Sequence, residues 1–216
     1  MIGKTGRAER AGVTRERILT AAERLFAEHG VFAVSNRQVS ETAGQGNNAA
    51  VGYHFGTKTH LVRAIIRRHA EPVERIRERL LADMDDSADV RDWVACLVRP
   101  VTEHLADLGP LTWYARFVAQ VATDPALRAI MAEETRASPS LSQTIEGFNR
   151  FLPELPAEVR AERGDMARQL ITHTCAERER ALAEGTPTAR SSWHDAATGL
   201  IDALVGLWLA PITPGP

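Results

Sequence analysis

Amide side chains near the amino end of the sequence have the chemistry to read a base pair. Asn47 and Asn48 can each donate and accept hydrogen bonds at once, which matches the N6/N7 edge of adenine, and Gln45 can do the same. Either asparagine could instead cap a helix, and Asn47 is the better candidate for that role.

Hydroxyl, imidazole and ammonium groups follow directly, and such groups suit phosphate oxygens; they belong to Tyr53, His54, Thr57 and Lys58. In the alternative interpretation, the Tyr53 ring packs in a small core and the Lys58 side chain is merely solvated. We expect phosphate contacts from Tyr53 and Lys58, while the two interpretations are evenly balanced for His54.

Short helices must position these side chains. Apolar residues between Thr14 and His29 fall on one helix face, with Thr14 as the expected N-cap and Gly30 at the far end. Ser35 is predicted to cap a second helix that runs to about Ala43. Residues 44–46 form a glycine-containing turn, and a third helix is expected from about Asn47 to Tyr53. Helix, turn and helix of this length are typical of a DNA-binding helix-turn-helix.

The hydrophobic periodicity of the rest of the chain also predicts helices. Thr57 should cap a longer helix that Pro72 kinks or ends, and further helices are expected at about 88–106, 111–122, 125–150, 157–184 and 191–210. No segment shows the alternation of a strand. The sequence therefore predicts an all-α protein of about nine helices, with a DNA-binding head at residues 1–56 and a helical body at residues 57–216.

Charge divides the chain in the same way. Residues 1–68 hold eleven basic and five acidic side chains, a net charge of +6, although the whole chain carries −2. A basic head on an acidic body favours a polyanionic partner for the head alone. The two cysteines, Cys96 and Cys175, and the absence of an apolar stretch in residues 1–13 fit a cytoplasmic protein with no membrane span.

The string Tyr53-His54-Phe55-Gly56-Thr57-Lys58 resembles the TetR family of transcriptional regulators, because Ala43-Gly44 and Gly30 precede it at matching intervals. The resemblance covers about residues 14–66. It implies a three-helix DNA-binding head and an all-α body that dimerises and binds a small effector. Such proteins are usually repressors that an effector releases from a palindromic operator.

The resemblance also implies roles for individual residues. Ser35 and Arg37 match the family's backbone-contacting start of the first motif helix; Asn47, Asn48 and Ala49 match the opening of the recognition helix. Tyr53, His54 and Lys58 match its phosphate-contacting end. The turn is one residue longer than the commonest family pattern, since Gln45-Gly46 replaces a single apolar residue, and this affects the register of the base-reading residues.

The last helix is predicted to lie in the interface of a homodimer. Small residues recur along one side of it, which allows a second helix to approach closely, and the other sides are apolar. A two-fold operator also requires a two-fold protein. The expected interface residues are Ile171, Cys175, Gly199, Ala203, Leu204, Gly206 and Leu207. The alternative is that the last two helices pack only within the chain.

An effector site is expected among the middle helices, where aromatic faces carry a few polar groups. Its candidate residues are Trp93, Leu97, His104, Trp113, Phe117, Met131, Phe148, Leu170 and His173. Pro100 should also leave the Cys96 carbonyl without a helical donor, and thus free for a ligand or a water. An ordinary hydrophobic core has the same composition. If His104 and His173 line one cavity, an apolar effector with one or two hydrogen-bonding groups is predicted.

Two other function classes account less well for the sequence. An enzyme would need a nucleophile motif, a phosphate loop, a dinucleotide fingerprint or a paired metal spacing, and none occurs, so no catalytic residue, metal or cofactor is expected. A helical protein-interaction module does not account for the basic head or the spacing of its amides and aromatic residues. The effector, the operator and the regulated genes, and whether the protein represses or activates, are not defined by the sequence.

Overall fold

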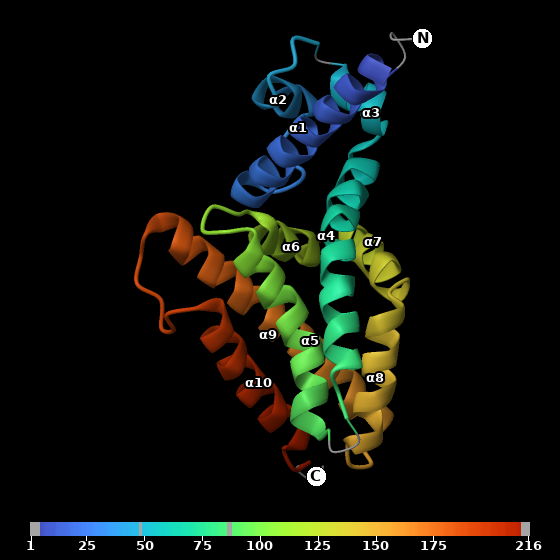
Figure 1. Cartoon of the computed structure of the whole chain (residues 1–216), viewed down its shortest axis with the longest axis vertical. Helices are drawn as coiled ribbons and strands as arrows, with labels where there is room; N and C mark the ends of the chain where they lie inside the picture. Colours follow the sequence, from blue (N-terminus) through green and yellow to red (C-terminus); the bar gives the residue numbers. More distant parts are fainter. Residues whose placement is uncertain (1–4, 48, 86–87, 213–216) are drawn as a thin grey trace. The chain divides into compact units, whose positions relative to one another are not determined.

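The protein is all-α, as predicted. The structure, a computed structural model, describes residues 5–47, 49–85 and 88–212. Within these ranges it contains ten helices and no strand (Figure 1): α1 Thr5–His29, α2 Asn36–Thr42, α3 Ala50–Phe55, α4 Lys58–Ala82, α5 Val90–Asp107, α6 Tyr114–Thr123, α7 Pro125–Arg136, α8 Pro139–Phe151, α9 Ala157–Glu184 and α10 Trp193–Leu209.

Several helix boundaries differ from the expected ones. α1 begins at Thr5, so Thr14 lies inside the helix and does not cap it. The expected helix at 125–150 is two helices, because Ser138 adopts an extended conformation (φ −86°, ψ 110°) directly before Pro139 and caps α8. Pro72 lies within α4 and does not end it.

The chain forms two compact units. Unit 1 consists of Met1–His69 and Trp113–Glu134, and unit 2 of Ala70–Thr112 and Thr135–Pro216. These packing units differ from the division expected after residue 56, because α4 contributes to both units and the segment 113–134 joins unit 1. The division into a DNA-binding part and an effector-binding part stays a prediction about function.

Unit 1 holds the helix-turn-helix on one continuous apolar core. Ile18 and Phe26 of α1, Val39 of α2, Val51 of α3 and Leu61 of α4 are each fully buried in it. The Phe26 ring stacks on that of Phe117 of α6, with 6.4 Å between centroids. The short helices α2 and α3 are therefore fixed by burial of one face, since helices of this length are not stable alone.

Unit 2 is a helical bundle in which α5 packs against both α8 and α10, and α10 also packs against α9 (Figure 1). Tight packing shows at Gly147 of α8, where an added Cβ would lie 2.1 Å from the Trp93 ring of α5. In the described parts of the chain, no helix has the length and apolar character that crossing a membrane requires.

Candidate nucleic-acid interface and effector region

Helix α2 begins with a reciprocal cap, as predicted for Ser35. The Ser35 hydroxyl accepts a hydrogen bond from the Gln38 amide at 3.2 Å, and the Gln38 side chain accepts one from the Ser35 amide at 2.8 Å. Arg37, in the first turn of α2, is exposed and donates to the Glu41 carboxylate at 2.7 Å. The Ser35 hydroxyl thus has a structural role at the helix start, and Arg37 is accessible but ion-paired.

The turn after α2 is closed by backbone hydrogen bonds. Gly44, with φ +68°, donates to the Glu41 carbonyl at 3.0 Å, and Gln45 donates to the Ser40 carbonyl at 2.9 Å, the two bonds of a Schellman motif. The Gln45 side-chain amide also donates to the Ala43 carbonyl at 3.1 Å. The half-buried Gln45 therefore stabilises the turn with one of the groups that were predicted to read a base.

The recognition helix α3 starts later than expected, at Ala50 instead of Asn47. The exposed Asn47 side chain accepts a hydrogen bond from the Ala49 amide at 2.9 Å, and its carbonyl accepts one from the Ala50 amide at 3.0 Å. Asn47 thus stabilises the turn that leads into α3 but does not cap the helix, whose N-cap is Ala49, without a side-chain cap. Asn48 lies outside the described residues, and Ala49 is exposed.

The end of α3 presents an accessible aromatic pair. Tyr53 is 81% exposed, which excludes the interpretation that its ring packs in the core. The Tyr53 and His54 rings meet edge to face with 5.0 Å between centroids, and His54 is half-buried. The Tyr53 hydroxyl is therefore available to a partner outside this chain.

Lys58 has an unexpected structural partner. Its Nζ donates to the carbonyl oxygens of Val31 and Val34, in the connection between α1 and α2. Burial lowers the pKa of Lys58. Thr57, directly before it, caps α4 as predicted, since its hydroxyl accepts a hydrogen bond from the His60 amide at 3.1 Å. Lys58 therefore connects the start of α4 to the loop that leads into the helix-turn-helix. The sequence pattern had suggested only solvent or a phosphate group as the partner of its ammonium group.

Part of the basic charge of unit 1 is neutralised within the unit. Arg63 of α4 bonds Glu133 and Glu134 of α7 at 2.7 Å each, and Arg67 bonds Glu134 at 2.8 Å. On α1, the Arg15 guanidinium lies 4.9 Å above the Phe55 ring, beside the end of α3. The +6 charge of the first 68 residues is thus not spread evenly over the surface of this unit.

The nine residues expected to bind an effector lie in different surroundings. Phe117 is in the core of unit 1, with Trp113 and Met131 packed against that core. Trp93, Leu97, His104 and Phe148 belong to α5 and α8 in unit 2. Leu170 and His173 are exposed on α9. Periodicity identified apolar helix faces, but it does not say which helices those faces pack against.

An aromatic cluster in unit 2 contains part of the expected set. Trp93 lies 6.4 Å from Phe151 between ring centroids, and Phe148 meets Trp208 of α10 edge to face at 5.1 Å. The indole N–H groups of Trp93 and Trp208 are buried, and neither has a hydrogen-bond partner. The sequence analysis did not include Trp208 among the effector candidates, because its position on the last helix suggested only general packing.

The Cys96 carbonyl is not free, contrary to expectation. Arg77 of α4 donates to it from Nε at 3.1 Å and lies close to the hydroxyl groups of Ser138 and Ser140, at 3.4 and 3.3 Å. Burial lowers the pKa of Arg77, although Glu74 at 3.6 Å opposes this effect. A buried arginine thus takes the position that a ligand or water was expected to occupy.

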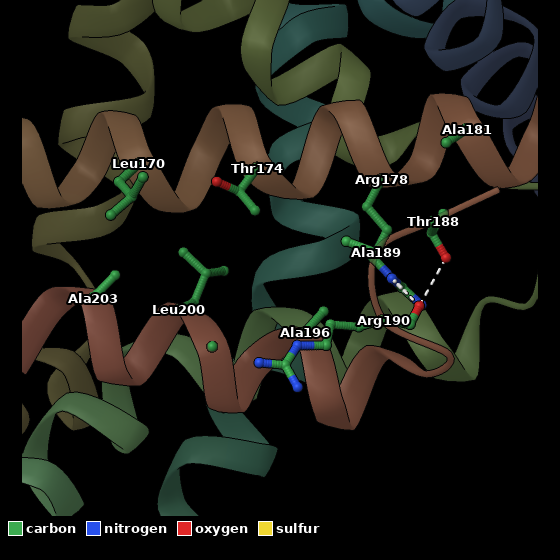
Figure 2. A pocket seen from close by; sticks show the side chains of 11 residues that line it. Leu170, Thr174, Arg178, Ala181, Thr188, Ala189, Arg190, Ala196, Leu200 and Ala203 are labelled. Atoms are coloured by element: carbon green, nitrogen blue, oxygen red, sulfur yellow. Dashed lines mark hydrogen bonds between the residues drawn. The ribbon is translucent and has the colours of Figure 1, made fainter. Parts of the chain in front are cut away.

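A groove of about 410 Å³ runs between α9 and α10 (Figure 2). Its lining residues include Leu170 and Thr174 of α9, and Gly199 and Ala203 of α10. At one end the Arg178 guanidinium donates to the Arg190 carbonyl at 2.8 Å, and its buried Nε has no partner.

The residues expected at a dimer interface divide into two groups. Gly199 and Ala203 line the groove, Gly206 is exposed, and Leu207 and Ile171 are half-buried. Cys175 and Leu204 are 2% and 1% exposed, so they pack inside the chain. Burial raises the pKa of the Cys175 thiol to about 12.

No group of three or more histidine, cysteine, aspartate or glutamate side chains that could hold a metal ion occurs among residues 5–47, 49–85 and 88–212. Three features of the described residues stand out: the exposed Tyr53 at the end of α3, the aromatic cluster of unit 2 with two buried donors that have no partner, and the groove between α9 and α10.

Comparisons with known proteins agree with this arrangement. Residues 18–65 match the family described as bacterial regulatory proteins, tetR family, and residues 95–206 match the tetracyclin repressor-like C-terminal domain. The HTH-type transcriptional repressor AcnR of Corynebacterium diphtheriae is 36% identical over 86 residues, which are 38% of this chain and 45% of that relative. The match therefore spans less than half the length of the relative.

Solved structures share the fold over most of the chain. A TetR family transcription regulator from Marinobacter aquaeolei VT8 superimposes with a TM-score of 0.62 at 16% identity, over 91% of this chain and 97% of the other. The multidrug binding protein EbrR, complexed with ethidium, gives a TM-score of 0.53 at 22% identity, over 90% and 97%.

Proposed function

Because the chain belongs to the TetR family of bacterial regulatory proteins, we propose that it is a transcriptional repressor whose affinity for an operator responds to a small molecule. The observation that carries this proposal is that one chain matches both the DNA-binding and the C-terminal domain of the family. The accessible Tyr53 and Arg37 support it. Such a protein acts by binding DNA in the cytoplasm and not by catalysis.

DNA binding is tested by selecting bound sequences from random duplex DNA and titrating the selected operator with salt. Binding through phosphate contacts weakens steeply, with a linear dependence of the logarithm of affinity on the logarithm of salt concentration. A purified protein with no affinity for any duplex at low ionic strength would rule out the proposal.

The effector site that we propose is the aromatic cluster of unit 2. Two buried indole N–H groups without partners cost free energy, and a ligand with acceptor atoms would satisfy them. The rings of Trp93, Phe148 and Trp208 supply apolar walls. We therefore expect an apolar, largely aromatic effector with one or two acceptors. EbrR in complex with ethidium is a relative with an aromatic ligand.

Effector binding is tested by screening compounds that release the operator complex and by following tryptophan fluorescence. Trp93→Phe and Trp208→Phe should each weaken binding of a releasing compound, because each variant removes one indole donor but keeps an aromatic ring. Trp113→Phe is the matched control, since Trp113 packs against the core of unit 1. A compound that binds all three variants like the wild type would place the site elsewhere.

A second copy of this chain is the occupant that we propose for the groove between α9 and α10. Small residues at Gly199 and Ala203 leave the groove open, and Leu170 beside it is 37% exposed. A homodimer would bury this apolar surface and supply the two-fold symmetry that a palindromic operator requires.

Helix α4 is the element that we propose to couple the two activities, since it contributes residues to both compact units. In this proposal α4 has two arrangements, and they differ in operator affinity. An effector can shift the equilibrium between them only if it binds the two arrangements with different affinities. Equal operator affinity with and without a saturating, tightly bound effector would refute this coupling.

A further inference from the structure

The two ends of the groove between α9 and α10 differ in chemical character (Figure 2). Leu170, Leu200 and Ala203 lie toward one end, and the side chains of Arg178 and Arg190 lie toward the other. We call the second end the arginine end. The apolar end is the surface that a second copy of the chain would cover, so the dimer proposed above accounts for the apolar end only.

The arginine end carries positive charge that no acid in the groove balances. Two arginines line the groove, and none of its described lining residues is an aspartate or a glutamate. Asp195 of α10 acts on the charge of Arg178 from outside the groove. The Asp195 carboxylate is already engaged, since it accepts hydrogen bonds from the hydroxyl groups of Ser191 and Ser192 at 2.8 and 2.7 Å.

Arg178 is nine-tenths buried, yet one edge of its guanidinium is unused. Its side chain packs over the Trp193 ring, with 5.1 Å to the centroid, and its Nη1 donates to the Arg190 carbonyl at 2.8 Å. The buried Nε has no partner, and no described residue accepts a hydrogen bond from Nη2. Nε and Nη2 form the edge that a carboxylate binds through two parallel hydrogen bonds, so the edge suited to a carboxylate is the one without an acceptor.

The surroundings of Arg178 favour an anionic ligand over a neutral one. Burial lowers the pKa of Arg178, although the charge of Asp195 opposes this effect. A buried charge costs free energy unless it is paired and its donors are satisfied. An anion at the free edge would supply both the opposite charge and the missing acceptors.

Arg190 would supply a second charged contact. Its side chain is exposed, and its guanidinium has no hydrogen bond or ion pair with a described residue. It lies beside α10, where an added Cβ at Gly199 would be 3.9 Å from its Nε and Nη2. The remaining lining of this end consists of small side chains and hydroxyl groups, from Thr174, Ala181, Thr188, Ala189 and Ala196. The arginine end therefore suits a charged head with a small apolar group.

We propose that the arginine end is a binding site for a small organic carboxylate, whose oxygens accept hydrogen bonds from Arg178 and Arg190 while its apolar part packs against the alanines. The site is distinct from the aromatic cluster of unit 2, since no residue of that cluster lines the groove. It leaves Leu170 and Ala203 to the second copy. The inference does not depend on DNA binding.

Isothermal titration calorimetry with hexanoate tests the site on the full chain, without DNA and in a chloride buffer free of other organic anions. Hexanamide has a similar shape but no charge, and it should not bind measurably. Acetate should bind at least about tenfold more weakly than hexanoate, because each buried methylene that it lacks contributes about fourfold. A wild-type protein that does not bind hexanoate, or that binds hexanamide as tightly, would overturn the inference.

Substitutions then locate the site. Arg190→Gln should weaken hexanoate binding about tenfold, because it removes one charged hydrogen bond, and it should leave the Tm unchanged. Arg178→Lys keeps the charge but loses the planar edge, so it should also bind about tenfold more weakly. Arg180→Gln is the matched control, since Arg180 is exposed on α9, pairs with Glu177 and does not line the groove.

Two results would place the carboxylate elsewhere: wild-type affinity in Arg190→Gln, or an equal loss of affinity in Arg190→Gln and Arg180→Gln. Operator binding is measured separately on selected duplex DNA. A protein that binds hexanoate but no duplex would therefore refute the proposed function and leave this inference standing.

Discussion

The Arg77 guanidinium of α4 donates a hydrogen bond to the carbonyl oxygen of Cys96 in α5, at 3.1 Å. Pro100 lies one turn further along α5 and has no N–H, so this carbonyl lacks its usual helical donor. Arg77 is 5% exposed. A side chain from another helix thus compensates for the defect that the proline introduces.

We predict that Arg77→Met lowers the free energy of unfolding by about 2–4 kcal/mol, because it leaves the Cys96 carbonyl without a donor and removes the positive charge that lies 3.6 Å from the Glu74 carboxylate. Urea denaturation measures this change. In a Pro100→Ala background residue 100 regains an N–H, so the same substitution should cost about 1 kcal/mol less. Arg75→Met, at an exposed position paired with Glu71, should change stability by less than about 0.5 kcal/mol. If Arg77→Met lowered the free energy of unfolding equally in the wild-type and Pro100→Ala backgrounds, Arg77 would not compensate for the missing N–H of Pro100.

Gly147→Ala should destabilise unit 2 even though alanine favours a helix. An added Cβ would lie 2.1 Å from the Trp93 ring, and overpacking of this kind costs about 1–3 kcal/mol. Gly164→Ala in α9 is the control, since its Cβ would make an ordinary contact with Trp208 at 3.9 Å. Thermal unfolding should show a lower Tm for the first variant only.

Acid should weaken the contact between α4 and α7. Hydrogen bonds from Arg67 and Arg63 hold the pKa of Glu134 below its ordinary value of 4.5. A carboxylate with a lowered folded-state pKa stabilises the protein above the unfolded-state value, and this stability is lost as the pH falls from there through the folded-state pKa. Glu134→Gln should therefore reduce the loss of stability between about pH 6 and pH 3. If urea titrations show the same pH dependence as for the wild type, Glu134 does not contribute to it.

Tyr53→Phe should weaken binding to every duplex by up to about tenfold, because it removes a single neutral hydrogen bond at most. Tyr53 is 81% exposed, so stability should stay within about 0.5 kcal/mol of the wild type. Lys58→Ala should instead reduce both DNA affinity and stability, since Lys58 also bonds the carbonyls of Val31 and Val34. Anisotropy titrations on operator and random duplex, paired with urea denaturation, separate the two effects. Tyr53→Phe binding with wild-type affinity would exclude the phosphate contact.

Ala203→Arg should block the groove between α9 and α10 and yield a monomer with weak operator affinity. Sedimentation velocity measures the oligomeric state. Ala137→Arg introduces the same side chain at an exposed position between α7 and α8, and it should remain a dimer. A dimeric Ala203→Arg variant would place the interface elsewhere.

Local signals in the sequence predicted most of the secondary structure. The cap at Ser35, the turn glycine at Gly44 and the cap at Thr57 depend on residues within a few positions of one another, so they can be identified without the fold. The all-α class followed from periodicity in the same way. The start of α1 was missed because residues 5–13 carry no apolar repeat.

Only the tertiary structure decided which groups meet across the chain. Lys58 reaches carbonyls 24 and 27 residues earlier, and Arg77 reaches one 19 residues later, and no local pattern encodes such pairs. The effector candidates divide between two units for the same reason. The sequence by itself therefore determined the all-α class, the approximate positions of most helices and the resemblance to the family. The fold determined which polar groups are engaged and which remain available, because burial and partners depend on residues distant in the sequence.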